Sequence, residues 1–219
     1  MKRPRRKRAG QYHHGDLRRA LIDQALETVD RLGAEGLTLR AVGEALGVSR
    51  TALYRHFADK QALVAAVARE GFRMLRLALV EAWEENGRGR AGFDAMGEAY
   101  LRFAVAHPSH YRVMFGRFVE SGARDPELIE EAAAAFQALV DALVELQREG
   151  QARKDDPQML ARFVWSVTHG IAMLVIDGQL RGDDELGMAL NRYAAERIRA
   201  AIAGSPSSRN ARHLGDRGE

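Results

Sequence analysis

Hydrophobic positions recur every three or four residues along most of the chain, a spacing that predicts α-helices with one buried side. The first stripe runs from Leu17 to Leu32, and Gly33 and Gly36 follow it as helix-ending residues. Later stripes predict helices over residues 38–47, 49–57, 61–85, 93–106, 111–118, 125–150, 157–178 and 185–203. The pattern therefore predicts an all-α protein of nine helices, three in an N-terminal head and six behind it.

Residues 38–60 predict two short helices joined by a tight turn. Thr38 and Ser49 are suitable N-caps, because their hydroxyls accept hydrogen bonds from backbone N–H groups in the first turn. Gly47 ends the first helix, and Val48 is apolar enough to fill the corner. Two helices that cross through a short turn containing glycine form the helix-turn-helix pattern.

The second of these helices carries polar side chains on the side that Leu53 and Phe57 leave exposed. A helix fits the major groove of B-DNA, and its first turn reaches the base edges. Arg50 is the candidate for base readout, since arginine pairs bidentately with guanine. Each side chain taken alone is also consistent with an ordinary solvated surface. The predicted DNA-binding residues are Arg40, Ser49, Arg50, Thr51, Ala52, Tyr54, Arg55, His56 and Lys60.

The segment GVSRTALYRHFADKQAL, from residue 47 to residue 63, resembles the recognition segment of the tetracycline-repressor (TetR) family of bacterial transcriptional regulators. The resemblance implies a helix-turn-helix head followed by a helical domain that binds an effector and dimerises. It also implies phosphate contacts for Tyr54, His56 and Lys60. The matching positions are Gly47, Val48, Leu53, Tyr54, His56, Phe57, Lys60 and Leu63.

Composition and charge limit the classes of protein that fit the sequence. The chain has no cysteine, so disulfides and thiolate chemistry are excluded. Residues 1–60 contain 13 Lys or Arg and 7 Asp or Glu. Residues 61–219 contain 20 Lys or Arg and 23 Asp or Glu. The positive charge therefore lies with the head, where a polyanion would bind. Since no apolar run reaches the length of a membrane span and the basic N-terminus lacks a signal-peptide core, we expect a cytoplasmic protein without a membrane partner.

Four segments are expected along the chain. Residues 1–11 form a disordered basic arm, which either contacts DNA or only solubilises the protein. Residues 12–60 form the helix-turn-helix domain, residues 61–203 the effector-binding and dimerisation domain, and residues 204–219 a disordered tail. His13 and His14 are adjacent but have no third ligand nearby, so we expect no metal, and we expect no cofactor.

The helix predicted at residues 157–178 is apolar on more than one side, so it must be covered on more than one side. One side can pack within the subunit, and the other can contact a second copy of the chain. Leu190, Tyr193 and Ile198 of the last helix would add to this contact. A C2 interface uses the same patch twice, which favours a homodimer through the last two helices. The TetR resemblance implies the same arrangement.

Aromatic and methionine side chains in the C-terminal part suggest a small-molecule site. Trp165-x-x-x-His169-Gly170, together with AHPSHYRVMFG at residues 106–116, resembles signatures of one TetR branch. Such side chains line apolar, adaptable pockets, although stripes of this kind are also ordinary core. The predicted effector-binding residues are Tyr100, Phe103, Met114, Phe115, Trp165, His169 and Met173.

These observations favour a ligand-responsive transcriptional regulator: a repressor that binds a palindromic operator in double-stranded DNA as a homodimer and is released by a small, largely apolar effector. One alternative is a nonspecific or architectural DNA-binding protein without an effector, to which the basic arm would be suited. The other is a helical enzyme, but the sequence has no HExxH pair, no phosphate-binding glycine loop and no nucleophile elbow.

Overall fold

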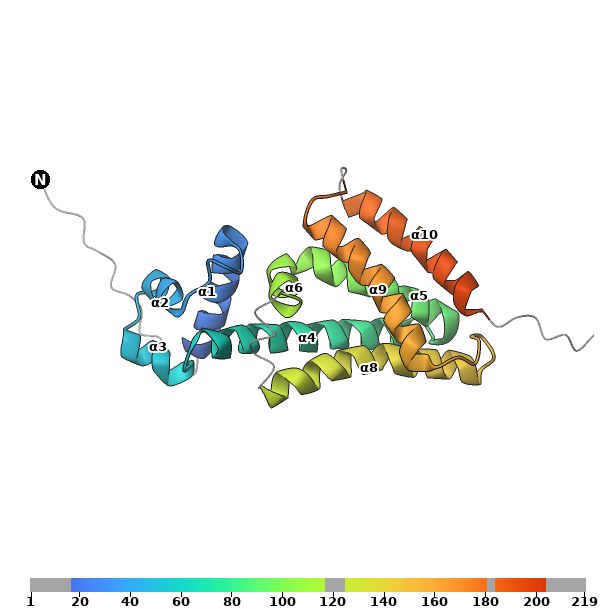
Figure 1. Cartoon of the computed structure of the whole chain (residues 1–219), viewed down its shortest axis with the longest axis horizontal. Helices are drawn as coiled ribbons and strands as arrows, with labels where there is room; N and C mark the ends of the chain where they lie inside the picture. The colour runs from blue at the N-terminus through green and yellow to red at the C-terminus, as the bar shows by residue number, and fades with distance from the viewer. Residues whose placement is uncertain (1–16, 117–124, 181–183, 204–219) are drawn as a thin grey trace, which may run out of the picture. The chain divides into compact units, whose positions relative to one another are not determined.

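The structure, a computed structural model, describes residues 17–116, 125–180 and 184–203. All regular structure in these ranges is α-helical, which confirms the predicted fold class (Figure 1). The predicted basic arm, the His13–His14 pair and the C-terminal tail lie outside the described residues. The helices are α1 (Leu17–Leu32), α2 (Leu39–Leu46), α3 (Arg50–His56), α4 (Lys60–Glu85), α5 (Gly89–Ala106), α6 (Pro108–Met114), α8 (Pro126–Arg148), α9 (Pro157–Ile176) and α10 (Asp184–Ile202).

The chain folds into two compact units. The first contains the residues up to Ala68 together with Ser109–Asp125, and so includes α1 to α3, the start of α4, and most of α6. The second contains Arg69–Pro108 and the chain from Pro126 onward, and so includes the rest of α4 with α5, α8, α9 and α10. The boundary proposed from the sequence, after residue 60, coincides with the start of α4, while the first unit continues to Ala68.

Side-chain caps set the ends of the short helices in the first unit. The Thr38 hydroxyl accepts a hydrogen bond from the backbone N–H of Ala41 at 3.0 Å, and the Ser49 hydroxyl accepts one from Ala52 at 3.2 Å. Gly47 ends α2 with φ = 67°, a left-handed conformation that glycine adopts without a steric penalty. These contacts confirm the expected caps and orient α3 relative to α2.

The buried side of α3 holds it on the first unit. Leu53 and Phe57 are each 3% exposed, so both are core residues. Gly43 of α2 allows the close approach of the two helices, since a Cβ atom there would lie 2.8 Å from Leu53 Cδ1. The opposite side of α3 is therefore turned to solvent.

Helix α5 is central to the second unit, because it packs against α8, α9 and α10. Helices α9 and α10, orange and red in Figure 1, also pack along each other. Leu101, Leu143 and Ala161 are fully buried and come from α5, α8 and α9. This packing brings together segments that lie far apart in the sequence.

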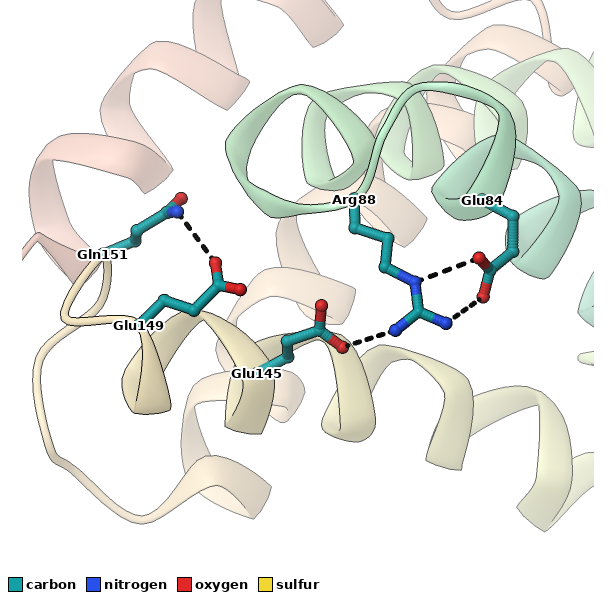
Figure 2. A network of polar contacts seen from close by, with 5 residues as sticks. All are labelled: Glu84, Arg88, Glu145, Glu149 and Gln151. Atoms are coloured by element: carbon teal, nitrogen blue, oxygen red, sulfur yellow. Dashed lines mark hydrogen bonds and ion pairs between the residues drawn. The ribbon is translucent and has the colours of Figure 1, made fainter.

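An arginine at the turn between α4 and α5 connects three helices (Figure 2). Arg88 has φ = 57°, which is unusual for a non-glycine residue. Its guanidinium donates to Glu84 of α4 at 2.8 and 3.0 Å and to Glu145 of α8 at 3.2 Å. The hydrogen bond and charge of Glu84, followed by the charge of Glu145, raise the pKa of Arg88. These contacts fix the start of α5, which carries part of the candidate ligand site.

One expectation about the subunit interface is wrong. Ile198 of α10 is only 5% exposed and lines a cavity within the second unit, so it is not available to a second subunit. Tyr193, on the same helix, is 54% exposed. The hydrophobic spacing alone did not distinguish the inner from the outer side of α10, because both sides carry apolar residues.

Candidate functional site

Helix α3 presents most of the predicted DNA-binding side chains on one exposed surface. Arg50, Thr51, Tyr54 and Arg55 are exposed, while Leu53 between them is buried. Of the other predicted DNA-binding residues, Arg40 and Ser49 are exposed, and Ala52, His56 and Lys60 are half-buried. The helix-turn-helix thus exposes a polar, positively charged side of the kind that enters a major groove.

Two of the arginines are already ordered by neighbouring side chains. The guanidinium carbon of Arg50 lies 5.4 Å from the centre of the Tyr54 ring, a cation–π distance. Arg40 Nε lies 2.7 Å from Glu44 Oε1, one turn further along α2. The hydrogen bond from Arg40 to Glu44, and the charge of Glu44, raise the pKa of Arg40. Both contacts limit the freedom of side chains that would meet DNA.

A hollow of ≈ 480 Å³ lies between α2 and α3 on this surface. Its polar lining comes from Arg40, Glu44, Arg50 and Tyr54. Glu44 was not among the predicted contacts, although its position four residues after Arg40 is a recognisable helical pairing signal. A carboxylate here either offsets the charge of Arg40 or accepts a hydrogen bond from cytosine N4.

In the second unit, three of the predicted effector-binding residues form a hydrogen-bonded chain. Trp165 Nε1 donates to the Tyr100 hydroxyl at 3.1 Å, and the same hydroxyl oxygen lies 3.2 Å from His169 Nδ1. Burial lowers the pKa of His169, which favours the neutral imidazole. A neutral ring with its proton on Nε2 accepts the Tyr100 proton at Nδ1, so this hydroxyl uses both its donor and an acceptor site.

A cavity of ≈ 50 Å³ lies beside these three side chains, lined by residues of α4, α5, α8, α9 and α10. Tyr100 and Trp165 line it, together with the polar side chains of Asp94, Thr168 and Asn191. The sequence reasoning missed these last three. No local pattern marks them, because Asp94 and Asn191 face each other's helix only after α5 and α10 have packed.

The remaining predicted effector-binding residues lie outside this cavity. Phe103 is 5% exposed and its ring centre lies 5.2 Å from that of His107. Met173 is half-buried on α9. Met114 and Phe115 belong to the first unit, where Met114 is buried and Phe115 packs on Tyr111.

A helix-turn-helix that exposes a cationic recognition helix defines the class of DNA-binding regulators. Two family models match the chain: "Bacterial regulatory proteins, tetR family" over residues 21–67 and "Tetracyclin repressor-like, C-terminal domain" over residues 93–198. The chain belongs to the TetR family of bacterial transcriptional regulators.

Individual relatives agree with this assignment. The chain is 28% identical over 159 residues to the HTH-type transcriptional regulator RutR of Escherichia coli K12, a match that covers 71% of this chain and 73% of RutR. It is 51% identical over 51 residues to the class C tetracycline repressor of Escherichia coli, covering 23% of each. A solved Rhodococcus sp. RHA1 protein of unknown function is 34% identical, with a TM-score of 0.77 and coverage of 88% of this chain and 98% of that one.

Family membership confirms the functional class predicted from the sequence. The named relatives are transcriptional regulators rather than enzymes. Ligand-responsive DNA binding and dimerisation are typical of the family, whose soluble members are typically cytoplasmic. Among the described residues, α9 is long and apolar enough to cross a membrane by length and composition, with a mean hydropathy of 1.6, but one such helix is weak evidence for a membrane protein.

Proposed function

We propose that this regulator is a repressor that binds a palindromic operator as a homodimer and dissociates when a small, largely apolar effector binds. The observation that carries the proposal is the exposed polar side of α3, on which Arg50 and Tyr54 lie one turn apart. In a twofold dimer, two copies of α3 enter successive major grooves with centres roughly 34–36 Å apart, or a multiple of that spacing.

The roles of the head residues follow from their positions. Arg50, in the first turn of α3, reads a base, and Thr51 and Ala52 lie close enough to touch bases or a thymine methyl group. Tyr54, His56 and Lys60 contact phosphates, as the family resemblance implies. Ser49 caps α3, Arg40 binds a phosphate from the start of α2, and Arg55 serves either purpose.

Operator specificity is the direct test of this proposal. The affinity of the full chain for DNA upstream of its own gene is compared with its affinity for random duplex at the same salt concentration. We expect the upstream DNA to bind roughly 10³-fold tighter or more. Equal affinity would reject the operator and favour the architectural alternative.

The homodimer is supported by apolar side chains that the second unit leaves exposed. On α9, Met159 is 61% exposed and Phe163 is 46% exposed, and Tyr193 adds to them from α10. A twofold interface would bury these side chains against the same patch of the second subunit. We expect Phe163→Glu to shift the protein toward monomer in sedimentation equilibrium, because the interface would bury two unpaired charges.

Leu77→Glu is the matched control for this test. Leu77 of α4 is 50% exposed, close to the value for Phe163, but it lies outside α9 and α10. If both variants changed the oligomeric state equally, or neither did, the interface would not lie on these two helices.

The effector is proposed to bind in the second unit beside Tyr100, Trp165 and His169. The chain belongs, on this proposal, to the branch with the Trp-x-x-x-His-Gly signature, and Phe103 and Met173 of the same unit remain predicted contacts. An effector releases DNA only if it prefers the conformation that binds DNA poorly. A metabolite screen that changed neither thermal stability nor operator affinity would contradict an effector site, and an unaltered response in Trp165→Ala or His169→Ala would remove that residue from it.

A further inference from the structure

A carboxylate lies within the surface that the first unit presents to DNA. Residues 38–60 contain two acidic residues, Glu44 and Asp59. Asp59 caps α4, because its carboxylate accepts a hydrogen bond of 2.8 Å from the backbone N–H of Ala62. Glu44 instead lines the hollow between α2 and α3, as Arg50 does, and its side chain is 64% exposed. DNA is a polyanion, so an accessible carboxylate on this surface requires an explanation.

The ion pair with Arg40 does not account for this carboxylate. Arg40 Nε lies 2.7 Å from Glu44 Oε1, but the two side chains are 86% and 64% exposed. Exposed pairs at this helical spacing contribute little to stability, because water screens the attraction and ordering two long side chains costs entropy. The hydrogen bond engages Oε1 of the carboxylate, and Oε2 belongs to an exposed side chain that a bound duplex can reach. The negative charge of Glu44 therefore acts on DNA as well as on Arg40.

This charge has opposite consequences for two kinds of complex. In a complex with an arbitrary sequence the head contacts mainly phosphates, which repel a nearby carboxylate. At a base edge the same group finds a donor, since carboxylates accept hydrogen bonds from N4 of cytosine in the major groove. A hydrogen bond to an ionised acceptor is stronger than one between neutral groups. One acidic residue can therefore weaken random complexes and stabilise a matching one, which increases specificity.

We propose that Glu44 is a specificity-determining residue: it lowers the affinity of the head for nonspecific DNA and accepts a hydrogen bond from a cytosine amino group in the operator. The inference rests on the proposed function, since it presumes an operator. It adds a residue of α2 to the base contact assigned to Arg50 of α3. Glu44 and Arg50 line one hollow of ≈ 480 Å³ from these two helices, so they would contact neighbouring base pairs.

Glu44→Gln tests the effect of the charge, because it removes the charge and keeps the size of the side chain. Binding of the full chain to a random duplex is measured by fluorescence anisotropy at several salt concentrations. We expect the variant to bind roughly fivefold tighter, and the slope of log K against log salt concentration to steepen by about one unit for each head bound. Operator affinity should rise less, so the preference for the operator falls. Unchanged affinity for random duplex, or an undiminished operator preference, would overturn the inference.

Glu27→Gln is the matched control. Glu27 is an exposed glutamate of α1 in the same unit, and it does not line the hollow. The substitution changes the net charge of the chain by the same amount, so we expect its affinity for random duplex to stay close to the wild-type value. If both variants strengthened random binding equally, net charge rather than the position of Glu44 would be responsible, and the inference would be wrong.

Arg40→Gln separates a direct effect of Glu44 on DNA from an effect through its ion pair. Glu44→Gln is added to this variant, in which the partner of the ion pair is already absent. We expect the added substitution to strengthen random binding by nearly the same factor as it does in the wild-type chain. No change in the Arg40→Gln background would show that Glu44 acts only by holding Arg40, which contradicts the inference.

Glu44→Ala tests the hydrogen bond to the base, because it removes the acceptor. Competition titrations with single-base operator variants should show a relaxed preference for a C·G pair at one position. Preferences retained at every position would reject base reading by Glu44. If the wild-type chain does not prefer its upstream DNA to random duplex, the proposed function itself fails. If the wild-type chain has that preference and the Glu44 variants keep it in full, only the inference fails.

Discussion

The two units place their polar chemistry in opposite ways. In the first unit, Arg50 and Tyr54 are exposed on one helix of 7 residues. In the second unit, Asp94 and Arg199 are 105 residues apart in sequence and form a part-buried ion pair, and Asp94 also lines a cavity. A surface that reads DNA must be continuous and accessible, whereas a ligand site must be concave and shielded from water. The first can be built from consecutive turns, and the second requires packed helices.

The largest expected effect concerns DNA binding by the exposed side of α3. We expect Arg50→Ala to weaken binding to the operator by about 1–3 kcal/mol and to relax the preference at one base position. Random duplex should be bound almost as before, because the lost contact reads a base. Competition titrations with single-base operator variants measure both quantities.

Lys60→Ala separates base reading from phosphate binding. We expect it to weaken binding to all DNA sequences by a similar factor. It should also reduce the slope of log K against log salt concentration by about one unit. If Arg50→Ala also weakened operator and random DNA equally, Arg50 would be a phosphate contact, and the head would carry no base reader at this position.

The internal site is tested by Tyr100→Phe. The substitution removes the hydroxyl that accepts from Trp165 and contacts His169, so we expect a loss of about 1–2 kcal/mol in the free energy of unfolding. Urea denaturation measures it. Operator affinity without effector should stay at the wild-type value, and a parallel loss of DNA binding would contradict the division of roles between the units.

Replacing a glycine by alanine should change the stability in opposite directions in the two units. Gly47 has φ = 67°, so Gly47→Ala should destabilise the end of α2 by about 1 kcal/mol. Gly170 lies within α9 with open space where a Cβ would be placed, so Gly170→Ala should stabilise by about 0.5–1 kcal/mol. Thermal melts compare the variants, and destabilisation by both would mean that the surroundings of Gly170 are not open in the assembled protein.

The smallest effect is a pH dependence from the internal site. Burial lowers the pKa of His169 below its ordinary 6.5, so the unfolded chain binds more protons than the native one just below that pH. The stability contributed by the neutral ring is present above about pH 6.5 and is lost as the pH falls toward the folded pKa. The difference in unfolding free energy between wild type and His169→Gln should change over this range, and a flat difference would show that the ring does not titrate differently on folding.

Local structure was predictable where the interacting groups are close in sequence. The caps of α2, α3 and α4 at Thr38, Ser49 and Asp59 each bind a backbone N–H three residues later, so the sequence shows both partners at once. The exposed side of α3 follows from the spacing of Leu53 and Phe57 for the same reason.

The candidate ligand site was predictable only in part. The spacing of Trp165 and His169 places them on one side of a helix, and Tyr100 proved to bind both. Asp94 was missed because its polar partner lies on α10, and Ile198 was assigned to the outside although it lines the cavity. Periodicity identifies a stripe but not the surface that the stripe contacts.

The sequence by itself determined the all-α class, the helix ends in the head and the residues available to a DNA groove, because each depends on contacts within one or two helical turns. Only the tertiary structure decided which side of α10 faces inward, and that Asp94, which lines a cavity, pairs with Arg199 of that helix. The physical reason is that burial and desolvation are properties of packed surfaces, which no single helix possesses before the others cover it.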